Sequence, residues 1–362
     1  MPTGVVLLNF GEPSTPDRAP VVDYLTRIFL ANASLEGAST EEEARTRARE
    51  LAERRVDGLL EEYEEIGGSP LNDQATGQAD RLQAALDDRG FEARTYVGMQ
   101  FTEPFIEEAV TEAIDDGVDH LVGLPIYPLC GPSTTVAALE EMRVAVDEHG
   151  WDGQVDELTG WHRHPAYNRL RADTVDRFAR DQGIDLQDAD TSVVFSAHGT
   201  PQHYLEEGSR YQQYVEEYCH SQAALLGIDT FELGYQNHEN RDIPWTEPDI
   251  EGLIETVAAD RIVVEPVSFM HEQSETLSEL DIELREEAEA EGLAFHRVPI
   301  PHDDERFPGL LADLIEPFLA GIDPGYYNLR QCQCRADPRA RCLNAPMEST
   351  VQTAAIEAER TD

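Results

Sequence analysis

The chain has 362 residues, which is long enough for two domains and far too long for a mini-protein. It holds 73 acidic and 27 basic residues, for a formal net charge of −46, and every one of those basic residues is an arginine. A surface this acidic argues against binding to nucleic acid or to anionic membrane, and the 40% of hydrophobic residues argues against disorder.

The charge also indicates the solvent in which the protein folds. Carboxylates spread over helix surfaces repel one another at low ionic strength, whereas molar salt shortens the Debye length to about 3 Å. We therefore expect the cytoplasm of a halophile. No charged leader precedes the first apolar run, no stretch approaches the roughly 18 apolar residues of a membrane-spanning helix, and the cysteines do not form the pattern of a secreted disulfide framework.

Short apolar runs bounded by Gly or Pro alternate along the chain with acidic stretches whose apolar positions recur every three or four residues. This alternation predicts an α/β fold of parallel strands with helices on both faces of each sheet. In chain order, the expected strands are 5–9, 93–98, 120–125, 193–197, 231–235, 261–267 and 293–298. The expected helices are 40–63, 77–88, 104–115, 166–182, 208–226, 249–258 and 275–290, with Asp249 as an N-cap.

An internal similarity divides the chain into two halves. Residues 4–13 resemble residues 192–201, since each is a buried strand that ends in Gly-x-Pro. The sequence therefore predicts an N-terminal domain over 1–165, a C-terminal domain over 166–320, and a cysteine-containing extension with a polar tail over 321–362. In open parallel sheets, ligands bind beyond the carboxyl ends of the strands.

One candidate for chemistry is the histidine in F-S-A-H-G-T-P, residues 195–201. His198 directly follows a predicted strand and precedes a glycine, so its ring can face a ligand at the end of the sheet. The ordinary pKa of histidine, about 6.5, suits proton transfer at neutral pH. The alternative is a loop histidine with a structural role only.

A second candidate is the acidic segment that begins at Ser274, S-E-T-L-S-E-L-D-I-E. On a helix, Glu275, Glu279 and Glu283 fall on one stripe at four-residue spacing. Like charges at this spacing destabilise a helix by a few tenths of a kcal/mol per pair, and a bound cation would relieve that cost. The alternative is a solvated acidic face, although apolar residues flank the stripe.

Aromatic and amide side chains follow the strand expected at 231–235. Tyr235 and Trp245 offer flat apolar surfaces and Gln236 offers an amide, a combination that suits a large planar ligand. The alternative for such aromatic residues is a place in the core. Because neither a Walker loop nor a G-x-G-x-x-G motif follows a predicted strand, we expect no nucleotide cofactor.

Two further motifs allow two interpretations each. The turn I-G-G-S-P-L, residues 66–71, either grips an anion through backbone amides or is an ordinary Gly-Pro turn. His162 and His164 share one face of an extended segment, so their rings either bind one metal or serve a structural role. We favour the structural role, because no third ligand is apparent nearby in the sequence.

Seven segments, taken in order, resemble the ferrochelatases, the enzymes that insert ferrous iron into a porphyrin. The segments are V-L-L-N-F-G-E-P, I-G-G-S-P-L, Y-V-G-M-Q-F, Y-P-L-C-G-P-S-T-T, F-S-A-H-G-T-P, Y-Q-N with P-W, and S-E-T-L-S-E-L-D-I-E. The resemblance implies two Rossmann-like domains of the chelatase type, each a parallel sheet flanked by helices, with a porphyrin cleft between them. With the composition, it points to a halophilic, archaeon-like source.

The resemblance also implies roles for single residues. His198 matches the catalytic histidine, Glu275 matches the glutamate that handles the metal, and Glu279 and Glu283 match a metal path along the helix. The porphyrin-binding residues it implies are Phe10, Ser69, Pro70, Met99, Tyr127, Tyr235, Gln236 and Trp245. We expect His198 and Glu275 to act from opposite faces of the ring, one as base and one as metal ligand, on a porphyrin bent at a cost of about 1–5 kcal/mol.

Three positions depart from the family pattern. Phe10 stands where relatives have methionine or tyrosine, Gln273 stands where many have histidine, and Glu12 replaces a usual glycine. These changes concern metal entry and substrate choice rather than the class of reaction.

The late cysteines indicate a cofactor that some ferrochelatases carry. By resemblance, a 2Fe-2S cluster would be held by Cys332, Cys334 and Cys342 together with Cys130, which lies two residues before the internal ligand of animal relatives. Thiolate is the soft donor that such a cluster requires, and four are needed. A zinc site or cysteines without a cluster are the alternatives, and Cys219 is expected in the core.

The expected reaction is the insertion of ferrous iron into protoporphyrin IX to form haem, with porphyrin and ferrous iron as the partners. Coproporphyrin III is the alternative substrate, and Arg27, Arg94 and Arg330 are the candidates to meet its two extra carboxylates. A cobalt or sirohydrochlorin chelatase is a further alternative because it shares the fold. A noncatalytic carrier of tetrapyrrole or iron would use the same site without turnover. No oligomeric state is predicted.

Overall fold

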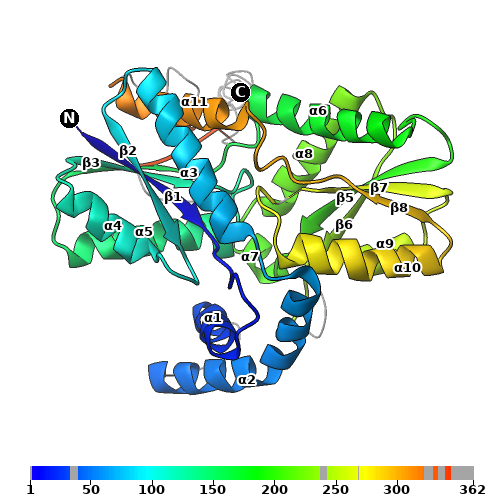
Figure 1. Cartoon of the computed structure of the whole chain (residues 1–362), viewed down its shortest axis with the longest axis horizontal. Coiled ribbons are helices and arrows are strands. Elements are labelled where there is room, and N and C mark those ends of the chain that lie inside the picture. Colours follow the sequence, from blue (N-terminus) through cyan, green and yellow to red (C-terminus); the bar gives the residue numbers. More distant parts are fainter. Residues whose placement is uncertain are drawn as a thin grey trace, which may run out of the picture.

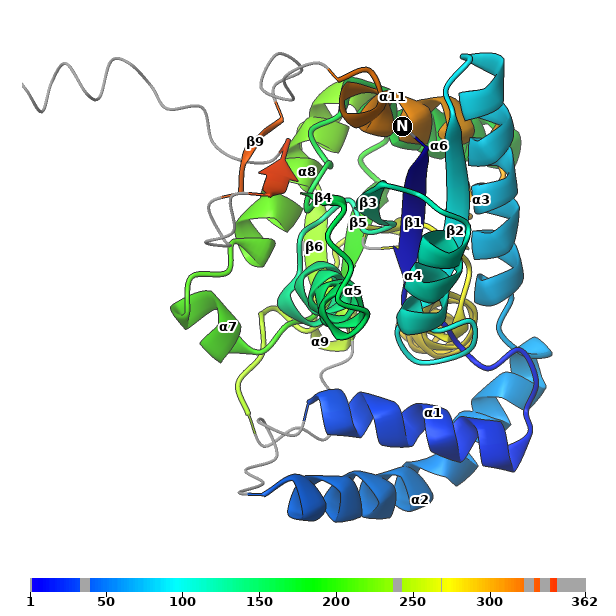
Figure 2. The ribbon, with the colours of Figure 1, turned by 90° about the vertical axis from the view of Figure 1, so that its left-hand side faces the viewer.

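The computed structural model describes residues 2–32, 40–236, 243–267, 269–321, 329–332 and 339–343. Two α/β domains lie side by side, and a pair of helices, α1 (Arg18–Ala31) and α2 (Glu41–Ile66), lies below them (Figure 1). Figure 2 shows from the side that α1 and α2 run next to each other, below the first sheet. The predicted α/β fold with two parallel sheets is confirmed.

The strands of each domain form one sheet. In the first sheet the order is β2–β1–β3–β4–β10–β9, and in the second it is β6–β5–β7–β8. Neighbouring strands are parallel, apart from the antiparallel pair of β9 with β10. The strands are β1 Thr3–Asn9, β2 Ala93–Met99, β3 His120–Pro125, β4 Gln154–Leu158, β5 Thr191–His198, β6 Glu232–Gln236, β7 Arg261–Pro266, β8 Ala294–Arg297, β9 Arg330–Gln331 and β10 Ala340–Cys342.

Helices connect and cover these strands. The α-helices are α3 Leu71–Asp88, α4 Ile106–Asp115, α5 Ala137–Glu148, α6 Pro165–Gln182, α7 Gln202–Glu206, α8 Tyr211–Leu226, α9 Ile250–Ile254, α10 Arg285–Ala290 and α11 Phe307–Leu319. Two further helices, η1 Pro132–Val136 and η2 Glu275–Leu284, have the wider π winding.

The sequence of β1 explains why both faces of the first sheet are covered. Val5 and Leu7 pack on one side with residues of α3 and α11, whereas Val6 and Leu8 pack on the other side with residues of α4 and α5. A strand that is buried on both faces needs a continuous apolar run rather than an alternating one. This run is the feature from which the parallel sheet is predicted.

The main apolar core is continuous from one domain to the other. It includes Leu7 of the first sheet, Phe195 of the second sheet, and Trp161 in the connection between them, all fully buried. The indole N–H of Trp161 donates to the carbonyl oxygen of Pro125 at 3.0 Å, which ties the connection to the end of β3. The two sheets are thereby held against each other.

The predicted elements match the structure best where apolar runs are strong. All seven predicted strands are present, with ends that differ by at most two residues, and Asp249 caps α9 by accepting from the backbone N–H of Gly252 at 3.2 Å. The pattern does not anticipate β4, α1, α5 or α11. β4 reads Q-V-D-E-L, which is mostly polar, and α11 contains Pro317, which ordinarily ends a helix.

The predicted helix 275–290 is present, but its winding differs from the expectation. Glu275–Leu284 form the π-helix η2, and α10 follows it. A π-helix has i→i+5 backbone hydrogen bonds, is rare, and is frequent at functional sites. The expectation of a uniform α-helix is wrong here, because the spacing of apolar residues does not distinguish the two windings.

The turn after α2 requires glycine. Gly68 has a φ of +90°, and a Cβ atom there would lie 2.1 Å from the carbonyl oxygen of Ser14. The backbone N–H of the next residue, Ser69, donates to the carbonyl oxygen of Pro13 at 3.4 Å. The turn therefore lies directly against the loop that follows β1.

Segments after the second sheet return to the first. α11 packs against α3, β10 extends the sheet beside β4, and β9 forms its edge. Part of the extension expected over 321–362 thus belongs to the first sheet. No helix in the described ranges is both long and apolar enough to cross a membrane.

Candidate active site

Several predicted site residues lie at the carboxyl ends of the parallel strands. Phe10 follows β1, Tyr127 lies two residues beyond β3, and His198 and Gln236 are the last residues of β5 and β6. This edge is where open parallel sheets bind ligands. Both domains therefore contribute side chains to one candidate site.

His198 and Glu275 are in direct contact. Nε2 of His198 lies 3.3 Å from Oε1 of Glu275, and the two side chains are 35% and 17% exposed. A flat ring between them would need about 7 Å, twice the van der Waals contact distance of about 3.5 Å. The expectation that they act from opposite faces of a ring is therefore wrong, and a planar ligand that reaches both meets them from the same side.

The ring nitrogens of His198 have distinct roles. Nδ1 lies 2.6 Å from the carbonyl oxygen of Gly199, and because a carbonyl oxygen only accepts, Nδ1 donates. Nε2 is the nitrogen that faces Glu275, so a proton or a cation between them satisfies both groups. The hydroxyl of Tyr211 donates to the carbonyl oxygen of His198 at 3.0 Å and holds the end of β5.

Gln236 fixes the start of η2 relative to the second sheet. Its Oε1 accepts from the hydroxyl of Ser196 at 2.7 Å. Its Nε2 donates to the carbonyl oxygen of Glu275 at 3.2 Å and to Oε2 of Glu279 at 3.3 Å. The oxygen of the amide is thus held by β5, and its nitrogen holds Glu275 and Glu279.

The three glutamates of η2 continue into a fourth, Glu62 of α2, and we call these four residues the carboxylate row. Burial raises the pKa of Glu279 well above its ordinary value, and the charges of Glu275 and Glu62 raise it further. Burial also raises the pKa of Glu62, and the charge of Glu283 adds to that rise, whereas the guanidinium of Arg55, 3.0 Å from Oε1 of Glu62, opposes it. A cation passing along the row would offset both effects.

The sequence pattern does not reveal Glu62, because this residue lies on a distant helix that only the fold packs against η2. In the ranges that the structure describes, no three His, Cys, Asp or Glu side chains are arranged as a metal-binding cage. The carboxylate row is therefore a series of separate oxygen donors.

Trp245 and Tyr127, two of the residues implied to bind porphyrin, have contacts or charge interactions with the His198–Glu275 pair, whereas Phe10 packs elsewhere. The rings of Trp245 and His198 have centroids 6.4 Å apart. The charge of Glu275 acts on the hydroxyl of Tyr127, whose pKa burial raises well above its ordinary value. Phe10 instead packs on Phe101 with ring centroids 4.6 Å apart, in the apolar cluster formed with α1 and α2.

The other implied porphyrin residues are more enclosed. Ser69 is buried and Pro70 is partly exposed in the turn after α2. Met99 is 1% exposed and packs with Leu71, whereas Tyr235 is fully buried in the main core. The burial of Met99 and Tyr235 favours the core interpretation for both side chains.

Two further polar residues, Gln100 and Glu141, extend from Tyr127 and are not among the predicted site residues, although Gln100 lies in the segment Y-V-G-M-Q-F. The hydroxyl of Tyr127 donates to Oε1 of Gln100 at 3.4 Å, and Nε2 of Gln100 lies 3.4 Å from Oε1 of Glu141. Burial raises the pKa of Glu141 to about 7. A carboxyl that titrates near neutrality beside such residues is suited to proton exchange with a ligand.

His162 and His164 do not meet a third metal ligand among the described residues. His162 is 2% exposed, its ring packs on Tyr214 with centroids 5.2 Å apart, and its Nε2 lies 3.8 Å from Oε2 of Glu217. Burial lowers the pKa of His162 and of His164. These contacts support the structural role.

Three of the four cysteines expected to bind a cluster lie near one another. Cys130, Cys332 and Cys342 are buried. A hydrogen bond with Cys332 and burial raise the pKa of Cys342 well above its ordinary value, and Cys130 is close enough to add to that rise. The pairing of β10 with β4 brings Cys342 to this place. Cys334 lies outside the described residues.

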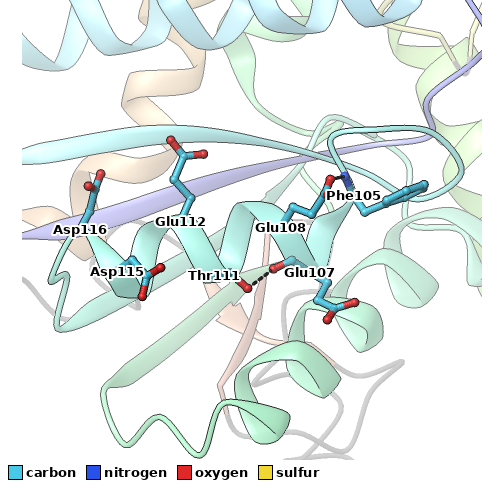
Figure 3. Close-up of a pocket in the computed structure, with 7 residues that line it drawn as sticks. All are labelled: Phe105, Glu107, Glu108, Thr111, Glu112, Asp115 and Asp116. Atoms are coloured by element: carbon cyan, nitrogen blue, oxygen red, sulfur yellow. Dashed lines mark hydrogen bonds between the residues drawn. The ribbon is translucent and has the colours of Figure 1, made fainter.

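The hollow drawn in Figure 3 lies elsewhere, along α4. It is lined by Phe105, Glu107, Glu108, Thr111, Glu112, Asp115 and Asp116. Glu108 already accepts from the backbone N–H of Phe105 at 2.8 Å, and the hydroxyl of Thr111 donates to the carbonyl oxygen of Glu107 at 2.8 Å. None of the predicted site residues lines this hollow, which is the solvated acidic face of a helix.

Known proteins resemble the chain over most of its length. The family model described as Ferrochelatase matches residues 2–318. A ferrochelatase from Synechococcus sp. (strain RCC307) is 35% identical over 328 residues, which cover 88% of this chain and 83% of the relative. A ferrochelatase from Nostoc punctiforme is 32% identical over 322 residues, which cover 86% of this chain and 81% of the relative.

Among solved structures, a sirohydrochlorin chelatase of Bacillus subtilis subspecies spizizenii in complex with cobalt aligns with 89% of this chain and 97% of its own. Its sequence identity is 9% and the TM-score is 0.48. Both sequence relatives named above are cyanobacterial, so the expectation of a halophilic, archaeon-like source rests on composition alone.

Proposed function

This chain belongs to the ferrochelatase family, and we propose that it inserts ferrous iron into protoporphyrin IX to form haem, as an enzyme of haem biosynthesis. The observation that carries the proposal is the contact of His198 with Glu275 at the carboxyl ends of the strands, where the carboxylate row begins. An imidazole and a carboxylate at this place supply a base and an oxygen ligand for a divalent ion.

The reaction replaces two pyrrole protons with one dication. Ferrous iron must lose its bound water before it enters the ring, and carboxylate oxygens can replace that water in steps. The carboxylate row offers such oxygens in sequence, from Glu62 and Glu283 through Glu279 to Glu275. Glu275 is the last of them because it touches His198.

The pyrrole protons leave on the same side. Since Nδ1 of His198 is committed to the carbonyl oxygen of Gly199, Nε2 accepts the two pyrrole protons in turn and releases the first to solvent, to which this 35% exposed side chain is open. Glu275 stabilises the imidazolium each time. A pyrrole nitrogen must tilt toward this side to meet both groups. Contacts of the ring with residues such as Trp245, whose ring centroid lies 6.4 Å from that of His198, would supply the binding energy that holds it bent.

An anaerobic assay tests this function. The protein in molar KCl receives ferrous or cobaltous ion with protoporphyrin IX, coproporphyrin III or sirohydrochlorin, and metalloporphyrin formation is followed by absorbance. We expect many turnovers with ferrous iron and protoporphyrin IX. Stoichiometric binding without turnover would instead identify a carrier, and faster turnover of another tetrapyrrole or of cobalt would replace the proposed substrate.

We also propose that the C-terminal cysteines hold a 2Fe-2S cluster. Soft thiolate donors suit such a cluster, which supplies one-electron redox chemistry or structural cross-linking when bound. The hydrogen bond between the buried Cys332 and Cys342 supports the proposal, although in the described residues Cys130 is not grouped with them as a metal site. Cys334 is the fourth ligand expected from the sequence. The cluster would lie at the edge of the first sheet, where β10 pairs with β4.

Substituting one ligand tests the cluster. Anaerobically purified wild-type protein should absorb visible light and contain about two acid-labile sulfides per chain, since a 2Fe-2S cluster holds two. Cys342→Ala should lose both signals. Cys219→Ala is the matched control, since Cys219 is also buried but lies in α8. Absence of both signals from the wild type would overturn the proposal.

We further infer that the protein is adapted to the cytoplasm of a salt-rich cell. A net charge of −46 on 362 residues destabilises the fold by self-repulsion unless salt screens it. Dialysis from molar KCl into about 10 mM KCl, where the Debye length grows to about 30 Å, should lower the melting temperature measured by circular dichroism. An unchanged melting temperature would contradict the inference.

A further inference from the structure

The side chain of Glu12, which follows β1, reaches from the first domain into the second. We propose that Glu12 is a positioning residue, which holds the start of η2 and thereby sets where Glu275 meets the metal and His198. The inference rests on the proposed function. It is carried by a set of hydrogen bonds that joins both domains directly before Glu275.

Both oxygens of Glu12 bind one residue of the second domain. Oε1 accepts from the hydroxyl of Ser274 at 2.6 Å, and Oε2 accepts from the backbone N–H of Ser274 at 3.1 Å. Glu12 is 3% exposed and Ser274 is 7% exposed. Because a buried carboxylate with two such bonds has few other positions open to it, the bonds fix Ser274, and Glu275 is the next residue.

Ser274 stands at the N-terminal end of η2, which gives the contact added strength. The first N–H groups of a helix lack partners within the helix, and a negative charge at this end interacts favourably with the helix dipole. Glu12 thus supplies from the other domain the acceptor that a capping side chain ordinarily supplies locally. The helix that it caps carries Glu275, Glu279 and Glu283.

On its own side, Glu12 is anchored to the turn implied to bind porphyrin. Its backbone N–H donates to Oδ1 of Asn72 at 3.0 Å, and Asn72 in turn donates to the hydroxyl of Thr102 at 3.0 Å. Ser69 also hydrogen-bonds the Glu12 carboxylate. One side chain therefore connects the turn with Ser69 and Pro70 to the start of the metal-handling helix.

Further hydrogen bonds join the segment directly before Glu275, residues 271–274, to the first domain. Oε1 of Gln74 accepts from the backbone N–H of Glu272 at 2.9 Å, and Nε2 of His271 lies 2.7 Å from Oε1 of Gln78. Both glutamines belong to α3. Glu12 makes the contact nearest to Glu275, and the charge of Glu275 adds to the rise that burial causes in the pKa of Glu12.

Removing this carboxylate should affect iron more than porphyrin. For Glu12→Ala we expect kcat to fall and the KM for ferrous iron to rise, each by about tenfold, because lost hydrogen bonds to a charged group have effects of this order. The KM for protoporphyrin should stay within about twofold, since the groups that meet the ring remain. Glu12→Gln keeps an acceptor for Ser274 and should recover part of the loss.

A control and a double substitution separate positioning from general stability. Glu157→Gln also removes a buried carboxylate, one that pairs with Arg143 at 2.6 Å and lies in β4 away from the site. It should leave the KM for iron unchanged even if it melts at a lower temperature. If Glu12 acts through Ser274, then Glu12→Ala with Ser274→Ala should be no worse than Glu12→Ala alone.

Iron kinetics of folded Glu12→Ala equal to those of the wild type would overturn the proposal, and so would fully additive effects of the two substitutions. Circular dichroism and the melting temperature establish that each variant is folded before kinetics are compared. A wild type that binds porphyrin and iron without turnover would instead refute the proposed function. The two failures are therefore distinguishable in one set of measurements.

Discussion

His198→Ala should lose iron insertion while keeping its fold and its affinity for porphyrin. Nε2 of His198 is the nitrogen that faces Glu275, and Nδ1 is committed to the carbonyl oxygen of Gly199. Removing a group that transfers protons in the transition state lowers rates by about 10²- to 10⁴-fold, so we expect a loss of about 10³-fold, or about 4 kcal/mol. The anaerobic assay with protoporphyrin and ferrous iron measures the loss.

The fold should tolerate this change, because the side chain is 35% exposed and its removal leaves no large cavity. His203→Ala is the matched control, since His203 lies nearby in the sequence on α7 and packs on Tyr204 rather than on the site. We expect near wild-type rates for the control. Turnover by folded His198→Ala within about tenfold of the wild type, a loss smaller than that of a typical general base, would refute the assigned role.

Glu275→Gln should have the second largest effect. The amide keeps the size of the side chain but loses the charge that binds a cation and stabilises a protonated His198. Losing a charge-stabilising group from an active site lowers kcat by about 10²- to 10³-fold, and we expect a decrease in this range. Because the row of carboxylates also delivers the metal, the KM for ferrous iron should rise as well.

Glu286→Gln provides the comparison for this variant. Glu286 is exposed on α10, the helix that continues directly from η2, so it carries the same charge without reaching the site. Its substitution should change neither kcat nor the KM for iron. An unchanged kcat in Glu275→Gln would show that another group receives the metal, and Glu279 would be the next to test.

The positions of His198 and Glu275 could be predicted because local sequence carries them. β5 is buried from Val193 to Ala197 and ends at His198, and the edge where parallel strands end is the place for ligands. Glu275 heads a segment with glutamates at four-residue spacing beside apolar residues. Each of these two patterns spans about ten residues or fewer, and over such short spans the sequence predicts the type of element well.

The relation between the two groups could not be predicted. Their direct contact depends on how β5 and η2 pack, and on Gln236, which bonds to η2 from the end of β6. The π winding of η2 has no signature in the spacing of apolar residues. The sequence therefore leads us to expect a ring between His198 and Glu275, whereas Nε2 of His198 lies only 3.3 Å from Oε1 of Glu275.

Local sequence patterns also could not predict residues whose partners lie on distant segments of the chain. Glu62 joins the carboxylate row from α2, and Glu12 caps η2 from the other domain. In a chain with 73 acidic residues, Glu62 does not differ locally from its many solvated neighbours, and the segment around Glu12 does not indicate its partner in the other domain. Only burial and tertiary contacts distinguish them.

The most direct test of the account is a crystal structure of the protein with protoporphyrin bound. The account predicts a bent ring at the junction of the two domains, with Nε2 of His198 and the Glu275 carboxylate together on one side of it and facing a pyrrole nitrogen. A ring bound away from this pair, or one that lies between the two side chains, would contradict the account.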